Sequence, residues 1–264
     1  MKDSSLRLQD KNAIIVGPFN GTTQAILRGL TEFGASVGLI SEAPAGRYID
    51  GVNEAREIHA SYGRAAHFNF TLDSEKKMQD ALGQVVGTLG RVDCFIDASP
   101  LTWNSDTDAR DAAESCLVMA EKWIPFFLAK QRGRIVYLIE DPALAPLRSS
   151  ACADGLEDLT GAMNRLAAKY RAQNVTVNAI TVGVTEDFIL SAFPKTPSIK
   201  KSFEELSGKH PGVRLVETND IALSTAYLCS AMSAAVTGQV LRLTGGFHLG
   251  GGSAESSADY AAGL

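Results

Sequence analysis

The sequence has little that would suit it for binding nucleic acid or for crossing a membrane. No basic run is longer than a pair such as Lys200–Lys201, and the formal net charge at pH 7 is -5. A protein that binds the phosphate backbone usually carries a basic stripe, which releases counterions on binding. A membrane-spanning helix needs about 18 consecutive apolar residues, and the sequence has no such run. We therefore expect neither nucleic acid nor a membrane among the partners.

Cysteine and histidine are scarce and scattered. The four cysteines, Cys94, Cys116, Cys152 and Cys229, show none of the close C-x-x-C spacing of zinc and redox sites. The four histidines form no i,i+4 pair of ligands. We expect the cysteines to be small, buried, reduced thiols, because three of them lie in apolar stretches. No metal site is expected.

The composition is otherwise that of a folded globular chain. A hydrophobic fraction of 45% and a charged fraction of 21% argue against disorder, and 264 residues fit one large domain. We expect a single domain over residues 1–264. The polar residues 1–12 lack the apolar centre of a signal peptide, so a cytoplasmic location is expected.

Short apolar runs alternate with helical periodicity along most of the chain. The expected strands are Asn12–Val16, Ser36–Ile40, Ala65–Phe70, Val92–Ile96, Arg134–Ile139, Thr176–Ile180 and Gln239–Leu243. A first helical pattern runs through Ile26, Leu27, Leu30 and Phe33, and the other expected helices are Gly51–Tyr62, Ser74–Leu89, Ala109–Lys130, Asp154–Arg171 and Asp220–Met232. Strands rich in Val and Ile that alternate with helices predict a parallel sheet covered on both faces. The predicted fold class is therefore α/β, doubly wound.

Two segments stand apart from this alternation. Residues 185–214 carry Pro194, Pro197 and Pro211, which predicts an irregular segment, long enough to be a lid or substrate-binding loop. Residues 250–264 form a tail rich in Gly, Ser and Ala. This tail is expected to be either disordered or ordered against a neighbouring subunit.

Five segments between Lys11 and Gly246 carry recognisable patterns. They are Gly17-Pro18-Phe19-Asn20-Gly21, residues 92–100 (VDCFIDASP), Gly133-Arg134-Ile135-Val136, residues 175–183 (VTVNAITVG), and Thr237-Gly238-Gln239-Val240 with Gly245-Gly246-Phe247. In this order they resemble segments of the short-chain dehydrogenase/reductase family. The family's counterparts are its T-G-x-x-x-G-x-G turn, its N-N-A-G stretch, the strand before its catalytic serine, its V-N-A-I-x-P-G segment and its closing T-G-Q-x-x-x-x-D-G-G. The resemblance implies a single Rossmann-like domain.

The first segment departs from the family's phosphate-binding turn. In an active member this turn brings backbone N–H groups to the pyrophosphate of a dinucleotide at a helix N-terminus. Gly17 and Gly21 match glycines of the pattern, but Thr23 stands at its last glycine, and Pro18 has no N–H to donate. Val16 stands at the leading threonine. The resemblance therefore implies a degenerate phosphate cradle.

The positions that would contact the rest of the nucleotide are also altered. Ser41 stands at the position where an acidic residue would hold the ribose hydroxyls, and Glu42 follows it. Glu42 either holds the ribose, if the alignment shifts by one residue, or is a solvated charge at the strand end. Asn69 either contacts an adenine or is a turn residue. Residues 97–100, Asp-Ala-Ser-Pro, replace N-N-A-G beside the nicotinamide. We therefore expect this chain to bind no cofactor, with NAD(P) only in an active partner subunit.

The family's catalytic residues are replaced at every position. An active member uses a tyrosine as general acid, a lysine that lowers the pKa of that tyrosine, a serine that orients the carbonyl and a helix asparagine in a proton relay. Bringing a phenol to neutrality takes about 4 kcal/mol of differential stabilisation, so the cation is essential. Here Glu140 stands for the serine, Ser149 for the tyrosine, Ala153 for the lysine and Ala112 for the asparagine. We expect no catalytic residue in this chain.

This loss does not depend on the alignment register. Between Gln131 and Ala168 the sequence has one tyrosine, Tyr137, and no lysine. Tyr137 lies three residues from Glu140 on the same strand, which predicts the opposite face of the sheet. Arg148 is a candidate for the missing cation, as in the related halohydrin dehalogenases, but those enzymes keep the serine and the tyrosine.

The favoured function is that of a non-catalytic subunit, a pseudoenzyme that supports an active homologous dehydrogenase subunit in a heterodimer or heterotetramer. The fold needed for assembly survives the loss of a few side chains. In the family, contacts between subunits are made by the two long helices, here residues 109–130 and 154–171, and by the last strand with the helix before it. Some bacterial CoA-ester dehydrogenases, including that of anaerobic benzylsuccinate breakdown, resemble pairs of one intact and one degenerate subunit.

Two alternatives remain open. Glu140, at the end of a parallel strand, lies where such sheets bind ligands and could be the general base of a lyase, hydratase or cyclase, with Asp141 or Asp97 as a second carboxylate. The same acids could instead cap or salt-bridge the emptied cleft. The other alternative is a dinucleotide-responsive binding module without turnover, against which Pro18 and Thr23 count.

Overall fold

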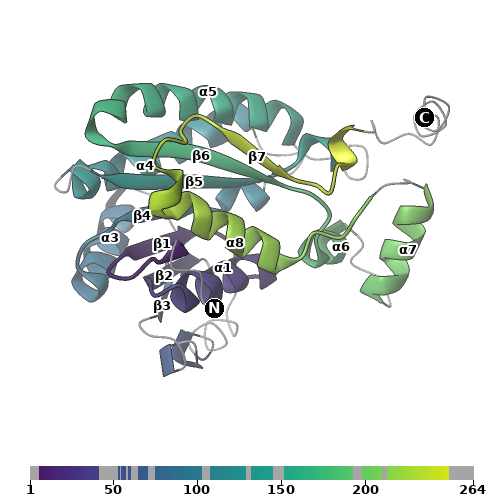
Figure 1. Ribbon diagram of the computed structural model, residues 1–264, viewed down its shortest axis with the longest axis horizontal. Coiled ribbons are helices and arrows are strands. Elements are labelled where there is room, and N and C mark those ends of the chain that lie inside the picture. Colours follow the sequence, from purple (N-terminus) through teal and green to yellow (C-terminus); the bar gives the residue numbers. More distant parts are fainter. Residues whose placement is uncertain are drawn as a thin grey trace.

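Seven strands lie in one parallel sheet (Figure 1), in the order β3-β2-β1-β4-β5-β6-β7. The computed structural model describes residues 6–41, 53, 55–57, 59–60, 65–70, 75–102, 108–128, 132–144, 152–192, 198–209 and 213–249. The strands are β1 Asn12–Val16, β2 Ser36–Ser41, β3 Ala65–Asn69, β4 Cys94–Asp97, β5 Gly133–Glu140, β6 Val175–Val182 and β7 Val240–Leu243. All six pairings of neighbouring strands are parallel.

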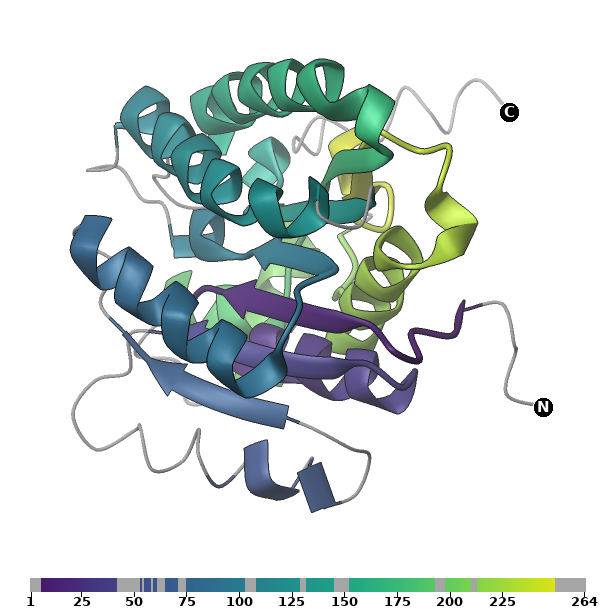
Figure 2. The same cartoon turned by 90° about the vertical axis from the view of Figure 1, so that its left-hand side faces the viewer.

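Helices cover both faces of this sheet. They are α1 Gly21–Glu32, α3 Glu75–Leu89, α4 Ala109–Leu128, α5 Cys152–Tyr170, α6 Glu186–Ala192, α7 Ile199–Lys209 and α8 Thr218–Cys229, with 3-10 turns η2 Ser99–Thr102, η3 Pro142–Leu144, η4 Arg171–Gln173, η5 Ala231–Ser233 and η6 Phe247–Leu249. Residues of α3, α4 and α5 form one core with the sheet, and residues of α1 and α8 form the other. Figure 2 shows α4 and α5 side by side on one face. The prediction of a doubly wound, Rossmann-like domain is confirmed.

The strand order indicates where a ligand crevice should lie, which is at the carboxyl ends of β1 and β4. The chain runs from β1 outward to β3 and then returns to β4 on the other side of β1. In doubly wound sheets ligands bind at this reversal, outside the carboxyl ends of the strands. The segments that follow β1, β4, β5 and β6 therefore surround the candidate site.

Strand β5 shows why this sequence makes a central strand. All eight of its residues are buried, and alternate side chains enter opposite cores, as the two-residue period of a strand requires. Ile135, Tyr137 and Ile139 join the core under α4 and α5, whereas Val136 and Leu138 join the core under α1 and α8. A continuous apolar run is typical of a strand covered on both faces.

The segment 185–214 differs from the prediction of an irregular loop. It contains α6 and α7, which lie beyond the end of β6 in Figure 1. The Thr185 hydroxyl accepts a hydrogen bond from the Phe188 amide at 3.0 Å and so caps α6. Pro194, Pro197 and Pro211 lie outside the described residues. Whether this segment serves as a substrate loop stays a prediction.

Some predictions fall on residues outside the described part of the chain. The tail 250–264 lies there entirely, and the expected helix Gly51–Tyr62 is described only at 53, 55–57 and 59–60, which are helical. In the part of the chain that is described, no helix has the length and apolarity to span a bilayer.

Candidate functional site

A cleft of about 350 Å³ opens at the carboxyl ends of β1, β5 and β6. Its walls come from the turn after β1, from η2, from the ends of β5 and β6 and from the start of α6. The lining residues are Pro18, Asn20, Thr22, Leu101, Thr102, Glu140, Val182, Gly183, Thr185, Asp187 and Phe188. The cleft lies at the reversal of strand order, so it is the candidate ligand site.

The turn after β1 is closed by its own side chains. Asn20 caps α1 by accepting a hydrogen bond from the Thr23 amide at 3.1 Å, and the Thr23 hydroxyl accepts one from the Asn20 amide at 3.3 Å. The same hydroxyl donates to the Pro18 carbonyl at 2.6 Å. Gly17 passes so close to β4 that a Cβ there would lie 2.8 Å from the Ala98 Cβ. Thr23 thus fills the inside of the turn, where the family pattern has a glycine.

The N-terminus of α1 already holds an anion from the same chain. The Asp187 carboxylate accepts hydrogen bonds from the Gly21 amide at 3.3 Å, from the Thr22 amide at 2.8 Å and from the Thr22 hydroxyl at 2.6 Å. α1 has no acidic residue in its own first turn, so its positive end is neutralised by α6. The sequence analysis missed Asp187, because the contact joins residues 165 positions apart.

The expected ribose position is engaged in a different contact. Ser41, at the end of β2, is buried, and its hydroxyl lies 2.7 Å from His67 Nε2 on the neighbouring strand β3. The Phe19 ring of the turn lies against His67, with ring centroids 5.2 Å apart. Burial lowers the pKa of His67. Asn69, at the end of β3, borders a separate surface hollow beside α3, and Glu42 lies outside the described residues.

The replaced catalytic positions are only partly brought together. Glu140 ends β5 and lines the cleft, with 7% of its surface exposed. Ala112 is half-buried on α4 and packs against the core. Ala153 lies in the first turn of α5, whereas Arg148 and Ser149 fall outside the described residues.

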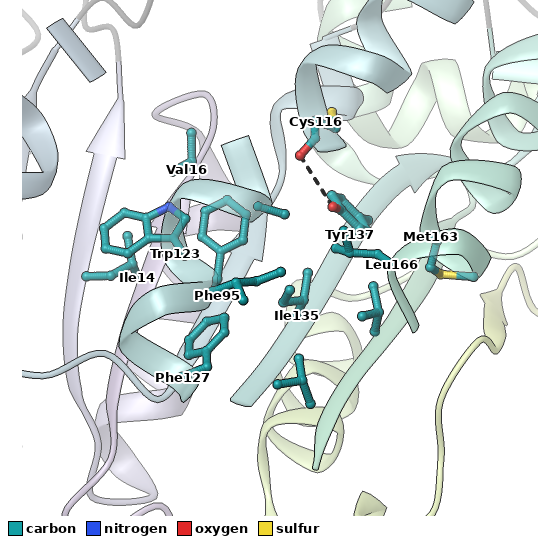
Figure 3. Packing of buried hydrophobic residues seen from close by; sticks show 14 of the residues in the cluster. Ile14, Val16, Phe95, Cys116, Trp123, Phe127, Ile135, Tyr137, Met163 and Leu166 are labelled. Atoms are coloured by element: carbon teal, nitrogen blue, oxygen red, sulfur yellow. Dashed lines mark hydrogen bonds between the residues drawn. The ribbon is translucent and has the colours of Figure 1, made fainter. Parts of the chain in front are cut away.

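Tyr137 is on the far side of the sheet from the cleft. Only 1% of its surface is exposed, and it packs in the core with Phe95, Ile135 and Leu166 (Figure 3). Its hydroxyl donates to the Cys116 carbonyl of α4 at 3.4 Å. Burial, and then the nearby Asp97, raise the pKa of Tyr137 well above its ordinary value. A proton donor at neutral pH needs the opposite shift.

Asp97 and Asp141 do not supply a second carboxylate to the cleft wall. Asp97, at the end of β4, is buried and accepts hydrogen bonds from the Ser99 amide at 3.0 Å and from the Ser99 hydroxyl at 2.5 Å. Burial raises the pKa of Asp97. Asp141 is fully buried, accepts a hydrogen bond from the Thr181 hydroxyl at 2.6 Å and lies 3.6 Å from the Arg242 guanidinium. Asp141 therefore links β5 to β6 and β7.

Metal ligands are not gathered at the cleft. In the described ranges, no group of three or more His, Cys, Asp or Glu side chains is placed to hold a metal ion. Cys94, Cys116 and Cys229 are buried free thiols, as the sequence predicts, whereas the side chain of Cys152 is not described.

The comparison with protein families gives a match over most of the chain. Residues 19–248 match a family model of the short-chain dehydrogenase/reductase type, described as enoyl-(acyl carrier protein) reductase. A tropinone reductase homolog from Datura stramonium is 23% identical over 262 residues, which cover 94% of this chain and 96% of that protein. Subunit BbsC of (2S)-[(R)-hydroxy(phenyl)methyl]succinyl-CoA dehydrogenase from Thauera aromatica is 28% identical over 178 residues, 64% of this chain and 68% of that protein.

Solved structures share the fold over nearly the whole chain. An L-sorbose reductase from Gluconobacter frateurii, in complex with NADPH and L-sorbose, has a TM-score of 0.75 at 18% identity and covers 92% of this chain and 98% of its own. A protein from Beutenbergia cavernae assigned as an NAD(P)-dependent gluconate 5-dehydrogenase, with bound NADP, has a TM-score of 0.75 at 21% identity and covers 93% and 99%.

These nucleotide-bound neighbours overturn the expectation that a chain of this pattern binds no cofactor. The expectation gave too much weight to the lost glycine at Thr23. The amides of Gly21 and Thr22 still point at one place, where they hold the Asp187 carboxylate, and such amides are the donors that a phosphate requires. Because the family match extends over most of the chain and the fold agrees, the chain belongs to the short-chain dehydrogenase/reductase family.

Proposed function

We propose that this chain is a subunit of an oxidoreductase complex that binds a nicotinamide dinucleotide but leaves the proton transfer to an active homologous subunit. The position of Tyr137 carries the proposal. That phenol is buried under α4, and the sequence has no other tyrosine between Gln131 and Ala168. A chain without a phenol at the cleft lacks the family's general acid.

The residue that replaces the serine strengthens this argument. Glu140 lines the cleft at the end of β5. An ionised carboxylate is only a hydrogen-bond acceptor, whereas a serine hydroxyl can also donate. In its ionised form Glu140 cannot donate to a substrate carbonyl as a serine does, and its charge would oppose the negative charge that develops there during reduction.

The residues at the turn fit a dinucleotide phosphate once Asp187 has moved away. Gly21 and Thr22 already bind two carboxylate oxygens through amide and hydroxyl donors, and phosphate oxygens can accept from the same groups. Gly17 permits the close approach of the turn to β4. A bound nicotinamide dinucleotide supplies hydride chemistry, whereas the residues of this chain would bind and orient it. The nucleotide-bound neighbours support this part of the proposal.

Exposed apolar side chains support assembly with another subunit. Val118, on the outer surface of α4, is 47% exposed, and Leu241 is exposed on the edge strand β7. α4 and α5 are joined by ion pairs of 2.9 Å between Arg165 and Glu114 and of 2.8 Å between Lys169 and Glu121. The two helices therefore lie side by side and can offer one shared surface to a partner. The relative from Thauera aromatica is itself named a dehydrogenase subunit.

The test is to express the chain alone and together with a homologous dehydrogenase gene from the same genome. Size-exclusion chromatography with light scattering should show a mixed dimer or tetramer, and nicotinamide-dependent activity should appear only in the mixture. Titration of the lone chain with NADH and NADPH should show saturable binding. Turnover of a substrate by the lone chain with NAD(P) would refute the subunit role.

A second candidate function follows from the burial of Glu140 in the cleft wall. A carboxylate there could abstract a proton as the base of a lyase, hydratase or cyclase. Incubation of the lone chain with carbonyl compounds in D2O should then exchange the proton next to the carbonyl, and Glu140→Gln should abolish the exchange. Equal exchange by the chain and by this variant would exclude the role.

A further inference from the structure

Each of the first four backbone amides of α1 donates a hydrogen bond to an acceptor of this chain. Asp187 holds the amides of Gly21 and Thr22, Asn20 holds the amide of Thr23 through its side chain, and the Gln24 amide donates to the Asn20 carbonyl at 3.0 Å. A phosphate can gain hydrogen bonds from these first amides only by replacing an acceptor. Asp187 is the acceptor that comes from another element, and it is half-buried rather than enclosed.

The contact has the form of an anion site. Both carboxylate oxygens of Asp187 are engaged, Oδ1 by Gly21 and Oδ2 by the amide and the hydroxyl of Thr22. The positive end of the helix macrodipole stabilises the charge, and hydrogen bonds to an ionised acceptor are stronger than neutral ones. A pyrophosphate placed on the same donors would meet both a competitor and a like charge.

We propose that Asp187 is a displaceable internal anion that occupies the phosphate position of the dinucleotide site. In the ligand-free chain it fastens α6 to α1. Binding of a dinucleotide expels the carboxylate and frees the start of α6, so affinity for the nucleotide is set by competition with Asp187. The inference rests on the proposed function, because it assigns the α1 N-terminus to the dinucleotide phosphates.

The competition predicts opposite effects on stability and on binding. Asp187→Asn removes the charge and Asp187→Ala also removes the acceptor, so each should lower the melting temperature of the ligand-free chain. The same variants should bind NADPH, NADH and inorganic pyrophosphate at least tenfold more tightly than the unchanged chain, measured by isothermal titration calorimetry. A purely structural role would lower stability and leave binding unchanged or weaker.

Glu186→Gln is the matched control. Glu186 is the preceding residue of the same helical turn and is exposed, so this variant removes the same charge without touching α1. It should leave the melting temperature unchanged and the dissociation constants within twofold of their original values. If Glu186→Gln tightens binding as much as Asp187→Asn does, the tighter binding comes from the lower negative charge of the chain. It would then not come from the removal of a carboxylate from the phosphate position, and the proposal fails.

The outcomes separate the inference from the proposed function. Weak binding by the unchanged chain that tightens in both Asp187 variants supports both. Binding by the unchanged chain that does not tighten in the variants overturns the inference and leaves the function standing. Binding that appears only in the variants supports the inference and removes native nucleotide binding from the function. Absence of binding in all three proteins overturns both.

Discussion

Asp97 is a buried carboxyl group, and burial raises its pKa in the folded chain. An acid with a raised folded pKa binds its proton more tightly in the native state, so stability falls as pH rises through the unfolded pKa toward the folded one. Asp97→Asn keeps an acceptor for the Ser99 amide and hydroxyl but cannot ionise. We expect it to stabilise the chain at pH 7.5 and to be nearly neutral at pH 3.5, below the ordinary aspartate pKa.

Urea denaturation at the two pH values measures this difference. Asp141→Asn is the control, because Asp141 is equally buried but is compensated by Thr181 and Arg242. Asp141→Asn removes the carboxylate charge that faces Arg242, so it should destabilise the chain at pH 7.5 by about 1–3 kcal/mol. Destabilisation by both substitutions at pH 7.5 would contradict the view that Asp97 is poorly compensated.

Tyr137 is a core residue, and its substitution should behave accordingly. Its hydroxyl donates a hydrogen bond to the Cys116 carbonyl, which is long at 3.4 Å. Tyr137→Phe should therefore cost no more than about 1.5 kcal/mol of stability. The activity of the mixed complex should be unchanged, as measured by nicotinamide absorbance. Loss of activity in a variant that still folds and assembles would place this phenol in the reaction.

At the level of elements, α4 and β5 meet at a glycine. A Cβ at Gly133 would lie 2.7 Å from both Cβ and Cδ2 of Phe127, whose ring is fully buried. Gly133→Ala should therefore destabilise the chain by about 1–3 kcal/mol through overpacking. Gly87→Ala on α3 is the control, because a Cβ at Gly87 would meet no other atom within 4 Å. This variant should stabilise the folded chain by about 0.5–1 kcal/mol. Thermal denaturation of both variants shows whether the melting temperature falls for Gly133→Ala and rises for Gly87→Ala. Equal melting temperatures would contradict the packing argument.

The elements themselves follow largely from local periodicity. The strands and long helices form where the pattern predicts them, because burial on one or both faces imposes its period on each segment. The helices α6 and α7 differ from the predicted irregular loop, because that prediction rested on three prolines, all of which lie outside the described residues. Helix bounds also differ by a few residues, where caps and not periodicity decide the end.

The site is less predictable than the elements. Glu140 could be placed at the cleft because it ends a strand whose direction the fold class fixes. The contact between Asp187 and Thr22 could not, because it depends on how α6 packs against α1 across 165 residues of sequence. The family pattern also predicted a degenerate phosphate-binding turn. The amides that form an anion site are backbone groups, however, and side-chain substitutions do not remove them.

Across the whole molecule, the described replacements leave the scaffold intact: Glu140 lines the cleft, and Ala112 packs against the core. Among the described residues, the lining of the cleft includes two acidic residues, Glu140 and Asp187, and no lysine or arginine, whereas the cores on the two faces of the sheet are apolar and continuous. Packing stabilises the fold independently of the groups that perform chemistry. An intact scaffold is what the proposed association with a homologous subunit requires.

The assembly itself gives the last prediction. Val118 on α4 is 47% exposed, and Leu190 on α6 is comparably exposed at 51%. If α4 forms the contact, Val118→Asp buries an unpaired charge there and should weaken association with the active subunit at least 100-fold. Leu190→Asp should leave association unchanged, because α6 lies beside the cleft. Light scattering and activity of the co-expressed pair measure both variants. A stable, active complex with Val118→Asp would exclude α4 as the contact, since a desolvated carboxylate at an interface cannot be accommodated without a partner.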